Sequence, residues 1–406
     1  MEKNILILTT TNEFLGKFER ENVRILQRMG YRVHYAANMH EPHYISDQER
    51  IGKMGVMVHH IAIVRSPYMV KENRTALRQL LKIIEDHGIQ VIHCHTPVGG
   101  LLGRLAGKFY RKRRLTIIYT AHGFHFYKGA PAFNWLVYYR VEKKLAHYTD
   151  ILIVINKEDY EIARKFKLRD SGCLYQIPGV GLDRKLFFPL REKEKVLSRQ
   201  ELGIPKDSFF LISIGELNEN KNHKIVLDAL AKMRGQGKDI SRIRYVICGD
   251  GFFRKRMEEW IKERKLEEIV FLYGHRKKIP RILGCADASV FPSKREGLGM
   301  AGLESLSMGV PVIASDNRGT REYMEHKKNG YICKYDDVDG FIKGIEFIQN
   351  LSPKKRKEMA VYCESCTAPF DQAYANAVMQ GIYTGVDMKL EHRLAEEAAP
   401  SKIGSV

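Results

Sequence analysis

The segment at residues 288–309, ASVFPSKREGLGMAGLESLSMG, contains the parts of one recurring structural unit. ASVFPS is a short apolar run, typical of a buried strand, and the glycines after it suit a tight turn. MAGLESLSMG predicts a helix that is closed by Gly309, with Pro311 just beyond. Two carboxylates, Glu296 and Glu304, stand at either end of the turn region. The segment therefore predicts a strand, a loop that carries polar side chains, and a helix.

Short apolar bursts of this kind recur along the chain, and amphipathic helical stretches such as ALRQLLKIIEDHG lie between them. This alternation predicts parallel sheets covered by helices on both faces, an α/β fold class. In such sheets, ligands bind beyond the carboxyl ends of the strands. The predicted strands are NILILTT, YRVHYAA, GVMVHHIAI, IQVIHCH, LTIIYTAH, DILIVIN, FFLISIGEL, RYVICGDG, IVFLYGH, ASVFPS, VPVIASD and GYICKY.

A chain of 406 residues is long for one domain. A charged, proline-containing stretch, LDRKLFFPLREKEKVLSRQELGIPKDS, divides the predicted strands into two groups. We therefore predict two doubly wound, Rossmann-like domains, at 1–187 and 188–368, that face each other across a cleft. Residues 387–406 are predicted to form a polar tail.

The net charge of +19 indicates an anionic partner, which the charge alone leaves open among nucleic acid, lipid and phosphorylated substrates. Residues 101–150 hold ten Lys and Arg against two Asp and Glu. No apolar run approaches the roughly 20 residues of a spanning helix, and the N-terminus lacks a cleavage site. A cytoplasmic protein with reduced thiols is expected, because the seven cysteines form no paired framework.

Two loops after predicted strands in the second half offer groups for an anion. GDGFFRKR (249–256) has glycines that allow close backbone approach, but it is not a full dinucleotide fingerprint. GELNENKNH (215–223) carries Lys221, which could pair with a phosphate or could equally be a solvated surface lysine. The spacing of Glu296 and Glu304 separates their carboxylates by several ångströms, so they need not serve as one acid/base pair. They could accept hydrogen bonds from two parts of a long polar ligand, or serve only as a helix-start carboxylate and a surface carboxylate.

The first half has one candidate loop, YTAHGFHFYKG (119–129), which places His122 in an aromatic turn. This histidine could bind a sugar hydroxyl or act as an acid or base, and a purely structural role is the alternative. HCH (93–95) alternates on a strand end and does not close a zinc site by itself. DVD (337–339) is better explained as a helix start. No metal site is predicted.

Together these segments resemble the retaining glycosyltransferases of family 4, which have the GT-B fold. The resemblance extends from NILIL to IYTG near residue 384, and EGLGMAGLE matches the family's Glu-x7-Glu motif. HCHTPVGG, YTAHGFHFYKGAP, GELNENKN and DNRGTRE are similar to the bacterial capsule and exopolysaccharide branch. The resemblance implies that residues 369–386 form a C-terminal helix crossing back to the first, acceptor-binding domain, and that the second domain binds a nucleotide-sugar donor.

The resemblance also implies roles for residues at matching positions. Glu304 would hold the ribose hydroxyls, Glu296 would face the donor sugar, and Lys221 would pair with the diphosphate. His122 would contact the sugar near its reacting carbon. The residues that would meet the sugar, the phosphate and the base are Gly297, Leu298, Gly299, Met300, Gly274 and His275.

Two positions depart from the family pattern. Family members usually carry an arginine five residues before the lysine, whereas this chain has Glu216. We hypothesise that Arg295 or Arg318 supplies the missing positive charge. The usual Gly-Gly loop after the first strand is replaced by TTTNEFLGKF, where Gly16 stands alone, so acceptor choice is left open.

The resemblance implies transfer with retention, in which the departing phosphate takes the acceptor proton and no metal or cofactor is required. It further implies a nucleotide-sugar donor, most commonly UDP-N-acetylhexosamine or UDP-hexose, and a polyprenyl-diphosphate-linked glycan acceptor. The basic and aromatic surface is expected to touch anionic lipid at the inner face of the membrane. The residues expected on this surface are Arg111, Lys112, Arg113, Arg114 and Trp135.

Two other functions fit part of the sequence. A nucleotide-sugar epimerase of similar shape would need its own acid/base carboxylates and would not need the Glu-x7-Glu spacing. A basic nucleic-acid-binding protein fits the charge, but the chain shows no stacking platform or groove-reading motif. We therefore expect no nucleic-acid partner.

Overall fold

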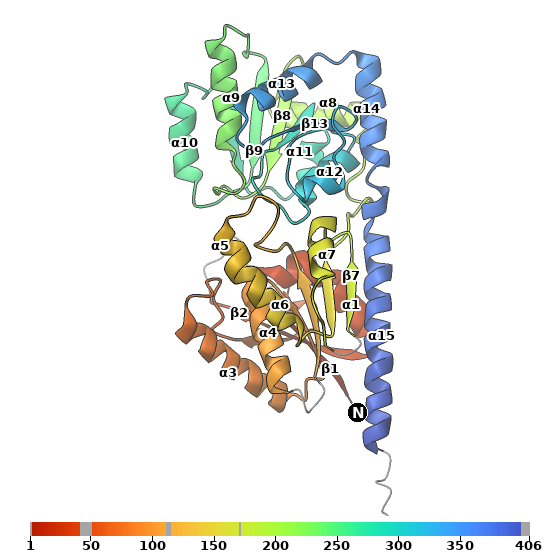
Figure 1. The fold of residues 1–406 in the computed structure, drawn as a ribbon. Coiled ribbons are helices and arrows are strands. Elements are labelled where there is room, and N and C mark those ends of the chain that lie inside the picture. Colours follow the sequence, from red (N-terminus) through yellow and green to blue (C-terminus); the bar gives the residue numbers. More distant parts are fainter. Residues whose placement is uncertain (1, 41–50, 111–114, 170–171, 399–406) are drawn as a thin grey trace, which may run out of the picture. The chain divides into compact units, whose positions relative to one another are not determined.

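The computed structural model describes residues 2–40, 51–110, 115–169 and 172–398. The chain divides into two compact units, residues 1–180 with 373–406, and residues 181–372. The second unit thus begins at Gly181, before the predicted boundary at 187, and its last residue is Gln372, not 368. Each unit is built around one parallel sheet (Figure 1).

The first unit has a parallel sheet in the spatial order β3-β2-β1-β4-β5-β6-β7. Among the described residues, twelve of the thirteen strands coincide with predicted apolar bursts. The exception is β7, whose side chains are only partly buried. The strands of this sheet are β1 (Lys3–Thr11), β2 (Tyr31–Asn38), β3 (Met57–His60), β4 (Val91–His95), β5 (Thr116–Ala121), β6 (Ile151–Val154) and β7 (Cys173–Gln176).

Alternating side chains of this sheet face two different sets of helices. One face packs with α3 and α4 through Ile92, Cys94 and their neighbours in the main hydrophobic cluster. The opposite face includes His93, which contacts α15 through Tyr383. The helices of the unit are η1 (Leu15–Glu19), α1 (Arg20–Arg28), α3 (Val70–Asp86), α4 (Pro97–Phe109), α5 (Ala132–Asn134), η3 (Trp135–Tyr139), α6 (Arg140–Ala146), α7 (Lys157–Ala163) and α15 (Gln372–Ala398).

Helix α15 corrects the predicted polar tail. It continues to Ala398, so residues 387–398 are helical, and the rest of the predicted tail, 399–406, lies outside the described residues. Val386 and Leu390 are buried, and Asp387 forms a 2.8 Å ion pair with Lys3 at the start of β1. These contacts tie the helix to the first sheet, and the resemblance implied a return to the first domain for residues 369–386. None of the described helices is both long enough and apolar enough to span a bilayer.

The second unit has a parallel sheet in the order β10-β9-β8-β11-β12-β13. Its core joins α9, α10 and α13 to one face of the sheet. Its strands and helices are β8 (Phe209–Ile214), β9 (Ile243–Cys248), β10 (Val270–Gly274), β11 (Ala288–Phe291), β12 (Val312–Ser315), β13 (Gly330–Cys333), α8 (Glu192–Glu201), α9 (Lys224–Gly235), α10 (Arg254–Glu263), α11 (Ile279–Leu283), α12 (Met300–Ser307), η4 (Thr320–Glu322), α13 (Val338–Gln349), α14 (Pro353–Ser365) and η5 (Ala368–Phe370).

Both sheets reverse their strand order at one place. In the first unit, β2 and β4 flank β1, and in the second unit, β9 and β11 flank β8. At such a switch point the chain leaves neighbouring strands in opposite directions, and the loops at their carboxyl ends border a crevice. The loops after β8 and β11, and those after β1, β4 and β5, are therefore the places where this fold positions a site.

Candidate functional site

The loops after β8 and β11 meet at the switch point of the second unit and join Lys221 to Glu296. Lys221 Nζ lies 2.7 Å from Glu296 Oε1, and both side chains are largely shielded from solvent. The Lys221 ammonium also lies 5.2 Å from the centre of the Phe291 ring at the end of β11. The backbone N–H of Lys221 donates to Asn218 Oδ1 at 3.0 Å. These contacts hold one ammonium group at the carboxyl end of the central strands, where a phosphate could compete with Glu296 for it.

Amide side chains fix the loop that follows β11. Asn220 donates from Nδ2 to the backbone oxygen of Arg295 at 2.9 Å, and Asn317 donates from Nδ2 to that of Ser293 at 3.1 Å. The buried Tyr323 donates its hydroxyl to the backbone oxygen of Gly299 at 3.0 Å. Sequence reasoning missed Asn317 and Tyr323, although Asn317 stands in the DNRGTRE segment. The loop is thus preorganised from three directions.

Two glycines allow the loop to pass close to its neighbours. Gly299 has φ +88° as the N-cap of α12, and a Cβ there would lie 2.8 Å from the Phe291 ring. A Cβ on Gly319 would lie 2.8 Å from the backbone oxygen of Leu298 and 2.9 Å from the Cβ of Glu296. Larger residues would therefore displace Glu296 and the start of α12. The predicted α12, closed by Gly309 in a left-handed conformation, is confirmed.

Glu304 lies in the second turn of α12, and its carboxyl makes no hydrogen bond or ion pair with the described residues. Burial raises the pKa of this carboxyl to about 7, and the Lys221 ammonium opposes the rise. A shielded carboxyl without a protein partner is costly to ionise, because nothing replaces the water that it loses. Two ligand hydroxyls would supply the missing donors. This is the role that the sequence resemblance assigns to Glu304.

The two arginines that could replace the family arginine both belong to this neighbourhood. Arg318 is buried, and its Nε lies 3.4 Å from the backbone oxygen of Glu296. Arg295 is partly exposed in the loop after β11, and its side chain has no ion-pair partner within the described ranges. Either guanidinium could turn toward a diphosphate beside Lys221.

The glycines at the ends of β8, β9 and β10 bring these three strand ends close together. The backbone N–H of Gly249 donates to the backbone oxygen of Gly274 at 2.9 Å. A Cβ at Gly249 would lie only 1.8 Å from the backbone oxygen of Gly215. His275, which follows Gly274 in the sequence, is exposed. Gly274 and His275 thus lie at the carboxyl end of β10, which is two strands away from β8 in the sheet. Lys221 follows the carboxyl end of β8, at the same edge of the sheet.

In the first unit, His122 follows β5 and its ring contacts His95 at the end of β4. His122 Nε2 lies 3.1 Å from His95 Nδ1, and burial lowers the pKa of His122 to about 4. The imidazole is therefore neutral at pH 7. Its Nδ1 has no hydrogen-bond partner among the described side chains and backbone groups. A neutral histidine with one nitrogen anchored and one unused is suited to bind a sugar hydroxyl.

Glu19, which sequence reasoning missed, stands behind this pair. Its Oε1 lies 3.5 Å from His95 Nδ1, and burial raises the pKa of the carboxyl to about 8. Asn22 donates from Nδ2 to Glu19 Oε2 at 2.7 Å. Glu19 is the last residue of the π-helical turn η1, in a stretch with no sequence signal for burial. A protonated Glu19 next to His95 can hold the orientation of the His122 ring.

The residues predicted to contact the acceptor or the membrane do not share one environment in the structure. Gly16 is not in a loop but is buried as the second residue of η1. Trp135 starts η3 and is 37% exposed, next to exposed Phe133, Leu136 and Val141. The basic run of Arg111, Lys112, Arg113 and Arg114 lies outside the described residues.

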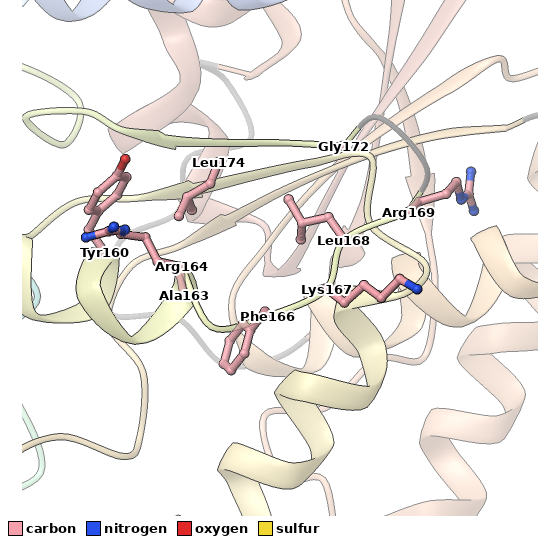
Figure 2. Close-up of a pocket in the computed structure, with 9 residues that line it drawn as sticks. All are labelled: Tyr160, Ala163, Arg164, Phe166, Lys167, Leu168, Arg169, Gly172 and Leu174. Carbon is pink, nitrogen blue, oxygen red and sulfur yellow. The ribbon is translucent and has the colours of Figure 1, made fainter.

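A pocket of about 530 Å³ lies beside α7 and β7 in the first unit, away from these residues in the sequence. Figure 2 shows that Arg164 points to one side of it, whereas Lys167 and Arg169 point to the other. Arg169 is also paired with Asp150 at 3.0 Å. The positive charges that line the pocket do not point to one place. The pocket is therefore a weaker candidate for the functional site than the switch-point loops.

Two family models match this chain. The model for glycosyl transferases group 1 matches residues 194–364, and that for glycosyltransferase family 4 matches residues 20–173. A Bacillus subtilis (strain 168) protein, provisionally named glycosyltransferase EpsD, is 35% identical over 97% of this chain and 100% of its own. An Escherichia coli protein named UDP-Gal:alpha-D-GlcNAc-diphosphoundecaprenol alpha-1,3-galactosyltransferase is 28% identical, covering 74% of this chain and 75% of its own.

Solved structures show the same fold at low sequence identity. Anabaena HepE, in complex with UDP and glucose, has a TM-score of 0.75 and 18% identity, with 95% of this chain and 100% of that chain covered. Sucrose-phosphate synthase from Thermosynechococcus elongatus has a TM-score of 0.75 and 17% identity, with 96% and 100% covered. The predicted fold is thereby confirmed. This chain belongs to glycosyltransferase family 4 and is a glycosyltransferase with the GT-B fold.

Proposed function

We propose that this glycosyltransferase moves a sugar, with retention, from a UDP-linked donor to a polyprenyl-diphosphate-linked glycan in bacterial exopolysaccharide or capsule synthesis. The observation that carries the proposal is the grouping of Lys221, Glu296 and Glu304 around the loops after β8 and β11. Family membership favours transfer over the epimerase and nucleic-acid alternatives. Relatives whose names specify UDP-Gal and diphosphoundecaprenol support the donor and acceptor classes.

The chemistry asks the protein chiefly to stabilise the leaving diphosphate. Lys221, an arginine beside it and the N–H groups at the start of α12 would each interact with the developing negative charge. Glu304 would accept the two ribose hydroxyls, and Glu296 and His122 would contact the donor sugar. The leaving phosphate oxygen would take the proton of the acceptor hydroxyl, so the reaction is proposed to need neither a metal nor a protein nucleophile.

The proposal is tested by incubating the purified chain with a panel of UDP-N-acetylhexosamines and UDP-hexoses and short polyprenyl-diphosphate-linked glycans. Transfer of one sugar with release of UDP and an α-linkage from an α-linked donor is expected. Release of an epimerised donor without acceptor would instead support the epimerase alternative. Transfer only from GDP- or ADP-sugars would overturn the donor assignment.

We expect Arg295→Ala or Arg318→Ala to weaken UDP binding about tenfold while leaving uridine binding nearly unchanged. A guanidinium that contacts the diphosphate contributes a charge-assisted hydrogen bond that the nucleoside cannot form. Titration calorimetry of UDP and uridine on both variants measures the difference. If both variants bind UDP as tightly as the wild type, neither arginine replaces the family residue at Glu216.

We also propose that the first unit docks on the cytoplasmic face of an anionic membrane. The exposed side chains of Phe133, Trp135, Leu136 and Val141 lie on consecutive turns of α5, η3 and α6. Exposed cations on α6, Arg140, Lys143 and Lys144, follow directly. Apolar groups beside cations are typical of helices that rest in a lipid headgroup region.

Vesicle binding tests this surface. Trp135→Ser with Leu136→Ser is expected to reduce binding to vesicles containing phosphatidylglycerol at least tenfold, and neutralising Arg111 to Arg114 is expected to weaken it further. Phe252→Ser is the matched control, because Phe252 is 83% exposed but lies in the second unit. Sedimentation of the chain with vesicles measures binding. Equal binding by the surface variants and the control would reject the docking surface.

A further inference from the structure

Three histidines from different elements meet in the first unit, far in sequence from His122. They are His34 on β2, His59 on β3 and His87, which caps the end of α3. The register pairs Ala36 with His59 and His34 with Met57, so His34 and His59 project from the same sheet face. That face is the one covered by α3, because Ala36 belongs to the same hydrophobic cluster as its residues Leu80 and Ile84. The end of α3 therefore delivers His87 to the other two rings.

The three rings are spaced as a metal site requires. One ring nitrogen from each histidine lies within 4.8 Å of the others. His34 Nδ1 lies 3.0 Å from His59 Nε2, and the ring of His87 lies 5.0 and 4.8 Å from those of His34 and His59. Tetrahedral zinc at 2.0–2.1 Å places its nitrogen ligands roughly 3.3 Å apart. Small side-chain rotations would thus bring all three nitrogens onto one ion.

The surroundings of His34 also suit a ligand. Its other nitrogen, Nε2, lies 3.4 Å from Asn4 Oδ1 on the neighbouring strand β1. If that N–H points to Asn4, the lone pair of Nδ1 faces His59 and the centre of the cluster. A metal-binding histidine commonly has its second nitrogen held in this way. Arg32, two residues before His34 on β2, is paired with Glu2 at 2.9 Å.

A second group of possible ligands, Glu19, His93 and His95, is a weaker candidate. All three residues are fully buried. Both ring nitrogens of His93 are within hydrogen-bond distance of a hydroxyl, Tyr383 at 2.8 Å and Thr120 at 2.8 Å. Glu19 accepts a hydrogen bond from Asn22. An ion there would have to break these bonds. His59 and His87 are only partly buried, so an ion could reach their cluster and keep a water as fourth ligand.

We propose that His34, His59 and His87 bind one divalent transition metal ion of the zinc class. The ion would fasten the edge strand β3 and the end of α3 to β2. His34 lies in the middle of β2 and His87 lies between α3 and the start of β4, whereas His95 and His122 lie at or beyond the carboxyl ends of β4 and β5. The metal site is therefore a structural site, separate from glycosyl transfer, and it does not depend on the proposed function.

Zinc binding to the full-length chain, prepared without a histidine tag and stripped by a chelator, tests the proposal. Titration against a chromophoric zinc indicator is expected to show one tight equivalent, and Co²⁺ is expected to give the visible absorption of a tetrahedral site. Zinc should also raise the unfolding temperature of the stripped protein. His59→Gln and His87→Gln should each weaken binding about 100-fold or more, since removing a ligand exceeds the effect of removing its support.

His60→Gln is the matched control. His60 follows His59 on β3 but points to the other face, where its ring is tilted against that of His40 and it accepts a hydrogen bond from the N–H of Met39. The affinity of the His60→Gln variant for zinc should equal that of the wild type. Thermal unfolding of the stripped variants shows whether each remains folded. Absence of a saturable equivalent would overturn the site, as would binding that survives both ligand variants or is lost in Glu19→Gln instead.

Discussion

Glu304→Gln is expected to make the free protein more stable at pH 8 and to abolish most of its affinity for UDP. Burial raises the pKa of Glu304 from 4.5 to about 7, so the folded chain binds this proton more tightly than the unfolded chain. Stability from this group is present below pH 4.5 and is lost as the pH rises through about 7. At pH 8 the ionised carboxyl costs up to about 3 kcal/mol, a cost that a neutral glutamine does not have.

The same substitution removes what the ligand would use. A carboxylate accepts hydrogen bonds from two ribose hydroxyls, whereas a glutamine side chain offers only one oxygen. Each lost bond to a charged group is worth about 1.5–3 kcal/mol, so UDP should bind roughly 100-fold more weakly or worse. Wild-type affinity should itself fall as the pH drops below 7, because protonated Glu304 can no longer accept both bonds.

Urea unfolding at pH 8 and pH 5, with and without UDP, separates the two effects. At 100 times its dissociation constant, UDP should stabilise the wild type by about 2.7 kcal/mol and the variant by very little. Glu267→Gln, an exposed carboxylate in the same unit, should change neither quantity. A variant that keeps the UDP effect would remove Glu304 from the ribose site. One that gains no stability at pH 8 would show that the carboxyl is not costly to ionise.

The strands could be predicted because each is a short, buried, apolar run between polar segments. The loops that carry Lys221 and Glu296 could be placed for the same reason, since they follow such runs directly. Their contact could not be derived from spacing, because 75 residues separate them and only the strand order places β8 beside β11. The family resemblance assigned both residues to the donor site but did not predict their contact with each other.

The features that the sequence did not indicate depend on contacts between residues that are far apart in the sequence. Glu19 lies in a charged helical stretch, yet it is buried and contacts His95, the last residue of β4. Residues after 387 have the composition of a tail, but Lys3 and the first sheet lie within reach of Asp387. The histidines at 34, 59 and 87 have no motif spacing, so only the pairing of β2 with β3 brings them together.

Lys221→Ala is expected to lower the turnover number by a factor of about 100 to 1,000. Loss of one preorganised positive group that faces developing negative charge has a cost of this size. The ion pair with Glu296 complicates the result, because the variant also leaves a shielded carboxylate without its partner. The double variant Lys221→Ala/Glu296→Gln removes that unpaired charge. It should recover stability without recovering turnover.

Lys294→Ala supplies the matched control for this experiment. Lys294 lies in the same loop as Glu296 and pairs at 2.9 Å with Glu219, so it too bridges the loops after β11 and β8. Its partner is exposed, and pairs of this kind contribute about 0–1 kcal/mol. Its loss should therefore leave turnover within about twofold of the wild type. Equal losses in Lys221→Ala and Lys294→Ala would show that the loops need only to be tied together. A loss confined to Lys221→Ala, persisting in the double variant, would instead require that this ammonium acts on the leaving diphosphate.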